Sequence, residues 1–261
     1  MQKFQLVKPS TKLSIPSMGK SFEMKTKIDP VQFDLSQLKI FVIHYKKLTT
    51  RKNHIISQFK NHNITNYEFI EIDRDELHDM DTSMFDETWN KGQIAIALSH
   101  FHAYAQISSG FDNGLIFEDD VILCNNFTNI FNSYMKELPM DYDMLFIGNG
   151  CGFHIPQRQI IANQHIYHKR DGGTRCSDSY LISKKCARNL CDYIENCARD
   201  IKTPIDLLLN NIISRNRFKV YWAEPTIVAQ GTRVGLFKSS LSDYYSKTRP
   251  VNKNKIRMSF I

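Results

Sequence analysis

The sequence KIFVIHY at residues 39–45 is the feature that most limits the fold, because its apolar side chains follow one another without polar alternation. In a strand with one solvent-exposed face, polar and apolar side chains alternate, whereas a continuous apolar run is typical of a strand buried on both faces. A polar, helix-like stretch at 51–61 and a second strand at 67–72 follow. This spacing fits a βαβ unit, so the pattern predicts a parallel pair of strands.

The same alternation continues to residue 223. Further strands are expected at 115–117, 144–147, 180–182 and 219–223, and further helices at 92–107, after Ser183 to about 199, and from Thr203. Thr203 is expected at the N-cap of the last helix, with Pro204 in its first turn. We therefore predict an α/β fold: one domain with a Rossmann-type, mostly parallel sheet and helices on both faces. Such sheets bind ligands at the carboxyl ends of their strands.

The helix at 92–107 has a defined apolar face. Ile94, Leu98, Phe101 and Ala105 recur at intervals of four, three and four, which predicts that this face is buried.

The two ends of the chain differ from the middle. Residues 1–35 are polar, with several prolines and lysines, and residues 236–261 are basic. We expect a polar N-terminal extension at 1–35, a domain at 36–235 and a loosely attached basic tail at 236–261.

Composition excludes some classes of protein. The 261 residues are 42% hydrophobic, too apolar for a disordered chain, and their net charge is +7. Lysine and arginine are not clustered with interleaved aromatic residues, so we predict no nucleic-acid partner. With no apolar stretch of about 18 residues and no signal peptide, we expect a soluble, unprocessed, cytoplasmic protein, its oligomeric state being open. The six cysteines form no CxxC pair, which argues against a structural zinc site and for reduced thiols.

Three consecutive acids, Glu118, Asp119 and Asp120, come directly after the buried strand at 115–117. Their mutual repulsion would be relieved by a divalent cation, and carboxylate oxygens are the ligands that Mg²⁺ and Mn²⁺ prefer. Alternate residues at a strand end point the same way, so Glu118 and Asp120 are the predicted metal ligands. A cation there would bridge a diphosphate and stabilise a leaving nucleotide.

At this point the sequence resembles glycosyltransferase family 25, the group of lipooligosaccharide and collagen galactosyltransferases, over roughly residues 38 to 232. Five blocks carry the resemblance in the family's order: GQIAIALSH at 92–100, LIFEDDV at 115–121, YLIS at 180–183, PID at 204–206 and EPTIVAQ at 224–230. The resemblance implies a GT-A fold, a UDP-sugar donor (often UDP-galactose), Mn²⁺ or Mg²⁺, and inversion at the anomeric carbon. The acceptor would be a hydroxyl of a glycan or glycoprotein.

The resemblance also implies where the nucleotide lies. It would sit near His44, Tyr45 and Arg51, and a guanidinium there could pair with phosphate. Asp73, at the end of the second strand, could accept a hydrogen bond from the base or ribose.

The acidic block at 118–120 and the helix at 92–107 would complete the donor site. Asp119 is expected to contact the donor. Ser99 and His100 are adjacent on a helix and cannot form a catalytic dyad, so we expect them to hold the donor loop or the acidic strand.

An inverting transferase needs a base for the acceptor hydroxyl, usually a carboxylate. Asp206 and Asp178 are the candidates, although Thr203-Pro204-Ile205-Asp206 also reads as a capping box in which Asp206 caps its own helix. Trp89 and Trp222 could stack on sugar rings or belong to the core.

The sequence departs from the family where His44-Tyr45 replaces an Asn-Leu pair and where Leu207 follows Asp206, and no histidine occurs after His168. Two other enzyme or binding functions stay open. A nucleotidyltransferase of related fold would usually have a glycine-rich loop, and residues 44–50 contain no glycine. A non-catalytic carbohydrate-binding descendant would not need the intact acidic triplet.

Overall fold

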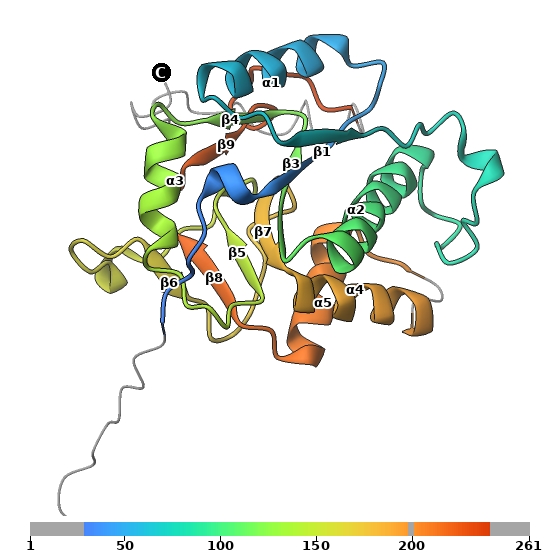
Figure 1. The fold of residues 1–261 in the computed structure, drawn as a ribbon. Coiled ribbons are helices and arrows are strands. Elements are labelled where there is room, and N and C mark those ends of the chain that lie inside the picture. Colours follow the sequence, from blue (N-terminus) through green and yellow to red (C-terminus); the bar gives the residue numbers. More distant parts are fainter. Residues whose placement is uncertain (1–28, 198–200, 241–261) are drawn as a thin grey trace, which may run out of the picture.

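The computed structural model describes residues 29–197 and 201–240 (Figure 1). A seven-stranded sheet runs through the centre in the order β2-β1-β3-β7-β5-β8-β6. The strands are β1 (Lys39–Ile43), β2 (Tyr67–Ile70), β3 (Asn113–Glu118), β5 (Met144–Phe146), β6 (Ile166–His168), β7 (Ser179–Ser183) and β8 (Val220–Ala223).

Strand direction in this sheet is mixed. β1 is parallel to β2 and β3, and β5 is parallel to β8, whereas β7 and β6 run against their neighbours. The expected α/β fold with a mostly parallel sheet is confirmed. The reversal of β7 matters for the site, because the beginning of β7 meets the end of β3: Ser179 pairs with Phe117.

Helices cover both faces of the sheet (Figure 1). One face packs against α2 (Lys91–Gly110), α4 (Lys184–Cys197) and α5 (Ile205–Asn216). The other packs against α1 (Thr49–Asn61) and α3 (Phe127–Met135). In β1, Phe41 and Ile43 enter the first core, and Ile40 and Val42 enter the second. Burial on both faces explains the unbroken apolar run.

The predicted face of α2 is confirmed in part. Ile94, Leu98 and Phe101 are partly buried against the core, whereas Ala105, predicted to be buried, is exposed. The fully buried positions are Ala97, His100, Ala103, Tyr104 and Ile107, because α2 packs on both the sheet and α4. The helix starts where Asn90 and Gln93 form a capping box.

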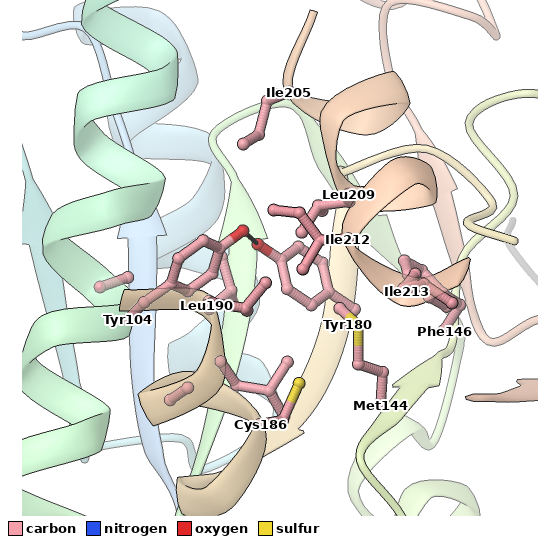
Figure 2. Close-up of a cluster of buried hydrophobic side chains, with 14 of the residues drawn as sticks. Tyr104, Met144, Phe146, Tyr180, Cys186, Leu190, Ile205, Leu209, Ile212 and Ile213 are labelled. Atoms are coloured by element: carbon pink, nitrogen blue, oxygen red, sulfur yellow. Dashed lines mark hydrogen bonds between the residues drawn. The ribbon is translucent and has the colours of Figure 1, made fainter. Parts of the chain in front are cut away.

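A pair of tyrosines joins α2 to β7 inside this core. The hydroxyls of Tyr104 and Tyr180 lie 2.7 Å apart and point toward each other among aliphatic side chains of α4 and α5 (Figure 2). Nδ1 of His100 lies 2.8 Å from the Tyr180 hydroxyl. The two tyrosine hydroxyls and Nδ1 of His100 thus have hydrogen-bond partners in an apolar setting, which fixes the side of α2 that faces β7.

A second, two-stranded sheet pairs β4 (Val121–Leu123) with β9 (Val228–Gln230), antiparallel. β4 starts immediately after the acidic triplet, so this pairing brings the segment after Gln230 to the acids. Three short 3-10 helices complete the described elements: η1 (Leu35–Gln37), η2 (Leu77–Asp79) and η3 (Gln157–Gln159).

The helix α5 begins one residue later than predicted. Pro204, with ψ near 158°, takes the N-cap, and no side chain caps the helix there. The expectation that Thr203 is the N-cap was wrong, because Pro204 is extended and cannot be the first helical residue. Asp206 lies in the first turn, where its Oδ1 accepts a hydrogen bond from the amide of Leu207 at 3.0 Å.

Residues at both predicted domain boundaries contact the domain. Val31 and Leu35 are buried, and the amide of Val31 donates to the carbonyl of Leu138. After residue 235, Phe237 packs on the guanidinium of Arg51. The remainder of the predicted extension and tail, 1–28 and 241–261, lies outside the described residues.

Within the described ranges, none of the helices has both the length and the apolar character that crossing a bilayer requires. Five cysteines, at positions 124, 151, 176, 186 and 191, are free thiols.

Candidate functional site

An open cavity lies at the carboxyl ends of β1, β2 and β3, where sheets of this kind bind ligands. The loops after β1 and β2 form one wall, and the first three turns of α2 form another. The acidic triplet lies at the β3 end, and the segment from Gln230 to Ser240 closes a further side. The residues that line it are Ile43, His44, Tyr45, Leu48, Arg51, Ile72, Arg74, Gly92, Ala95, Ile96, Ser99, Glu118, Asp119, Asp120, Gln230, Thr232, Ser239 and Ser240.

The three acids have different partners. Asp119 is bound on two sides: Oδ2 lies 2.8 Å from Nδ1 of His44, and Oδ1 accepts from Nη1 of Arg51 at 2.7 Å. The side chains of Asp119, His44 and Arg51 are all buried or nearly so. Asp119 is therefore neutralised by protein groups, and it fixes the loop after β1 to the end of β3.

Asp120 is the acid with one carboxylate oxygen that has no hydrogen-bond partner. Its Oδ2 accepts hydrogen bonds from the amide of Thr232 at 3.1 Å and from the Thr232 hydroxyl. Its Oδ1 is buried without a hydrogen-bond partner. Burial, followed by the nearby Glu118 carboxylate, raises the pKa of Asp120 to about 6. An orphaned, buried carboxylate oxygen beside a second carboxylate suits a hard cation.

Glu118 is the second carboxylate of this pair. Its Oε1 accepts a hydrogen bond from the Ser177 hydroxyl at 2.7 Å and lies 3.8 Å from Nε2 of His100. Nε2 of His100 is itself buried without a hydrogen-bond partner. Glu118 and Asp120 thus fit the predicted divalent cation, whereas Asp119 is already paired.

Asp178 lies behind this pair, at the start of β7. Its Oδ1 accepts from the amide of Gly150 at 3.0 Å and its Oδ2 from the Ser179 hydroxyl at 2.8 Å. A Cβ at Gly148 would lie 2.3 Å from Oδ2, and one at Gly150 would lie 2.5 Å from Oδ1, so both positions need glycine. Burial, then the charge of Glu118, raises the pKa of Asp178 to about 8.

Asp206, the other candidate base, is half-buried. Burial raises its pKa, with Glu118 adding a smaller contribution in the same direction. The charge of His100 acts on it in the opposite sense, which places Asp206 in the same electrostatic field as Glu118 and His100. Its Oδ1 accepts a hydrogen bond from the amide of Leu207.

The structure brings the residues predicted to bind the donor together around one cavity. His44, Tyr45, Arg51 and Ser99 line it with the acids. Arg51, however, also donates from Nη2 to the carbonyl of Lys238 at 2.6 Å, so its guanidinium is occupied by protein acceptors.

Two predicted residues lie just behind the cavity wall. Asp73 is buried, accepts from the amide of Asp75 at 2.8 Å and lies 3.2 Å from Nζ of Lys46. His100 is fully buried and reaches the site through Glu118.

The two tryptophans belong to the core. Trp222 is buried, donates to the carbonyl of Gly173 and has the guanidinium of Arg175 on its ring. Trp89 packs against the same core, tilted on Phe85.

Sequence reasoning did not find Arg74, Thr232, Ser239 or Ser240. Arg74 follows Asp73 and lies over the Tyr45 ring, 3.9 Å from its centroid, with Nη1 donating to the carbonyl of Ser240. A basic residue directly after a strand end is a usable signal for Arg74. Thr232 has the weaker signal of following the last family-like block.

Comparison with known proteins identifies the family. The sequence profile of glycosyltransferase family 25 (LPS biosynthesis protein) matches residues 37–209, which is most of the chain. The chain belongs to glycosyltransferase family 25. The matched region contains the acidic triplet, Asp178 and Asp206, with the expected α/β arrangement around them.

Two curated relatives are similar over part of their length. The lipooligosaccharide biosynthesis protein lex-1 of Haemophilus influenzae is 28% identical over 195 residues, covering 69% of this chain and 62% of the relative. The procollagen lysyl hydroxylase and glycosyltransferase of Acanthamoeba polyphaga mimivirus is 25% identical over 115 residues, covering 40% of this chain and 12% of the relative. The chain thus spans less than two thirds of the length of either.

Among solved structures, the catalytic domain of Drosophila β1,4-galactosyltransferase 7 with xylobiose has a TM-score of 0.41 at 10% identity, covering 84% of this chain and 78% of that one. Another structure of that enzyme contains manganese, UDP-Gal and xylobiose. Similarity at this level carries no argument about a substrate.

Proposed function

We propose that this chain is a metal-dependent glycosyltransferase that transfers a sugar, such as galactose or another hexose, from a UDP-sugar to a hydroxyl of a glycan or glycoprotein, with inversion. Family membership supports the reaction class. The observation that carries the metal and donor assignment is the buried Oδ1 of Asp120, which has no hydrogen-bond partner and lies next to Glu118 at the end of the open cavity.

The order of the strands supports one orientation of the donor. Tyr45 and Leu48 after β1, and Ile72 after β2, give that part of the cavity an apolar and aromatic lining. The carboxylates lie one strand further, at β3. The nucleoside would therefore lie over β1 and β2, and the diphosphate would reach Glu118 and Asp120.

The predicted cation would be held by Glu118 and Asp120, where Mn²⁺ or Mg²⁺ supplies charge stabilisation for the leaving diphosphate. His44 and Arg51 hold Asp119 and so keep the turn after β3 in place. Ser99, whose hydroxyl donates to the carbonyl of Ala95, presents a small side chain where α2 borders the cavity.

Asp206 is the proposed base. Asp178 is buried and both of its oxygens are held by Gly150 and Ser179, whereas Asp206 is partly exposed. The acceptor oxygen would attack the anomeric carbon while the bond to UDP breaks on the opposite face. The hydroxyl proton would pass to the Asp206 carboxylate.

Two alternatives have less support. A nucleotidyltransferase is disfavoured because the loop that follows β1 lines the cavity with His44, Tyr45 and Leu48 and has no glycine. A non-catalytic descendant would have no reason to retain a buried carboxylate oxygen without a partner.

The test is calorimetric titration of the purified chain with UDP-galactose, UDP-glucose and UDP, each with and without Mn²⁺, on wild-type protein, Asp120→Asn and the exposed control Asp112→Asn. Wild type and the control should bind at least one UDP ligand only with Mn²⁺, and Asp120→Asn should not. Equal UDP-ligand affinity in Asp120→Asn and wild type would overturn the metal assignment. Absence of binding of any UDP ligand to wild type would overturn the donor class.

A further inference from the structure

Two cysteines and an aspartate meet beside the acids, although they are far apart in the sequence. Cys151 follows β5, Cys176 precedes β7, and Asp206 lies in the first turn of α5. One ligand atom from each, the two Sγ atoms and a carboxylate oxygen, lies within 4.8 Å of the other two. All three residues are half-buried, and both thiols are free.

The backbone holds the two cysteines together. Cys176 has a φ of +84°, in the left-handed region that favours glycine, so its position is imposed by the surrounding loops. A Cβ at Gly150 would lie only 2.9 Å from Cβ of Cys176, so glycine next to Cys151 lets the two loops approach. The thiols are therefore brought together by the fold and not by a local CxxC motif.

The donor set selects a class of ion. Two thiolates and one carboxylate suit Zn²⁺, whereas Mn²⁺ and Mg²⁺ prefer oxygen ligands alone. With Zn–S near 2.3 Å and Zn–O near 2.0 Å, tetrahedral geometry places the ligand atoms about 3.5 to 3.8 Å apart. Distances within 4.8 Å are thus closed by small side-chain rotations. Three protein ligands leave a fourth position for water or an acceptor group.

The surroundings favour a cation. The negative charges of Glu118 and Asp206 oppose ionisation of the Cys151 thiol, and those of Asp178 and Glu118 oppose ionisation of the Cys176 thiol. A divalent ion would neutralise part of this negative charge. Arg233 also acts on Cys151, so the field is not wholly acidic.

We propose that Cys151, Cys176 and Asp206 form a second metal site, specific for Zn²⁺ and separate from the pair Glu118 and Asp120. Binding there occupies the Asp206 carboxylate, so zinc inhibits sugar transfer. The inhibition rests on the proposed role of Asp206 as the base, whereas the metal site itself does not.

Cobalt is the probe, because a thiolate bound to Co²⁺ gives a charge-transfer absorption in the near ultraviolet that oxygen ligands do not give. The full chain is titrated with Co²⁺ alone under reducing conditions, and the bound Co²⁺ is then displaced with Zn²⁺. The variants are Cys151→Ser with Cys176→Ser, Asp206→Asn, and the control Cys191→Ser. Cys191 is a half-buried thiol of α4 that lies near Ser108 of α2. Thermal unfolding confirms that each variant is folded.

Wild type and Cys191→Ser should show one thiolate-bound Co²⁺ per chain that Zn²⁺ displaces. The double variant should show none, and Asp206→Asn should bind Co²⁺ roughly tenfold or more weakly. Absence of the thiolate band in wild type, or its survival in the folded double variant, overturns the site.

The inhibition is measured separately. At saturating Mn²⁺ and donor, Zn²⁺ should inhibit transfer by wild type and not by the double variant. Equal inhibition of both would overturn the inhibitory role. A failure of the proposed function would appear as no transfer by any variant, with the cobalt result unaffected.

Discussion

The backbone amide of Glu118 donates a hydrogen bond to the backbone carbonyl of Asp178, with 2.8 Å between nitrogen and oxygen. This bond extends the antiparallel pairing of β3 with β7 by one step, to the point at the site where β3 ends and β7 begins. It holds a fully buried carboxyl, Asp178, beside Glu118. The resulting repulsion adds to the effect of burial on the pKa of Asp178, which rises to about 8.

Asp178→Asn should therefore stabilise the metal-free protein at alkaline pH. A carboxyl whose pKa is about 8 when folded and near 3.8 when unfolded makes the folded state lose stability as pH rises through this window. Asparagine mimics the protonated acid, because its oxygen can accept from Gly150 and its amide can donate to Ser179. The gain over wild type should be small near pH 5 and reach a few kcal/mol near pH 8.

Chemical denaturation of both proteins at pH 5, 6.5 and 8, with chelator present, measures this gain. Asp112→Asn, whose parent side chain is 92% exposed, serves as the control and should show no trend. A difference between Asp178→Asn and wild type that stays constant with pH would show that Asp178 is ionised throughout the range.

Arg51→Lys separates a structural role of Arg51 from phosphate binding. Arg51 bridges Asp119 and the carbonyl of Lys238, a geometry that a single ammonium cannot reproduce. We expect a loss of about 1 to 3 kcal/mol of stability and a modest loss of UDP affinity. Arg215→Lys, at an exposed arginine of α5, is the matched control. Unchanged stability with a loss of UDP affinity above about a hundredfold would instead place the guanidinium on the phosphate.

The segment after Thr232 is predicted to stabilise the donor cavity. The Phe237 ring lies 5.4 Å from the guanidinium carbon of Arg51 and 5.3 Å from the ring of His54. Phe237→Ala should weaken Mn²⁺-dependent UDP binding by about fivefold, or ~1 kcal/mol. Its neighbour Leu236 is 52% exposed, so Leu236→Ala should bind UDP as wild type does. Titration calorimetry compares the two, and equal effects would show that Phe237 has no specific part in the cavity.

Sequence patterns predicted those features that depend on local periodicity. The unbroken run at β1 predicted a strand buried on both faces, and the acids after β3 predicted a charged site at the sheet edge. Both follow from residues close together in the chain, where side-chain period and burial are directly linked.

Contacts between distant segments left no such signal. The reversal of β7, which brings Asp178 to Glu118, depends on how β7 pairs with β3 and not on its own composition. The hydrogen bonds from Thr232 to Asp120, and the meeting of Cys151 with Cys176, likewise depend on the closing of loops. Spacing along the chain shows only which cysteines are neighbours in sequence, so it could not predict that Cys151 and Cys176 meet.

Asp206→Asn tests the acceptor base. The variant keeps the shape and the acceptor for the Leu207 amide, so stability should change by about 1 kcal/mol or less. Transfer should slow by roughly a hundredfold or more, because the hydroxyl proton loses its acceptor, while donor affinity stays constant. Burial raises the pKa of Asp206 above the ordinary aspartate value of 3.8. As the pH is lowered, the wild-type transfer rate should therefore begin to fall while the pH is still above 3.8. Single-turnover rates across pH, with UDP-sugar titrations alongside, measure both quantities. If Asp206→Asn turns over normally per folded molecule, Asp206 serves α5 alone, and Asp178 becomes the base to test.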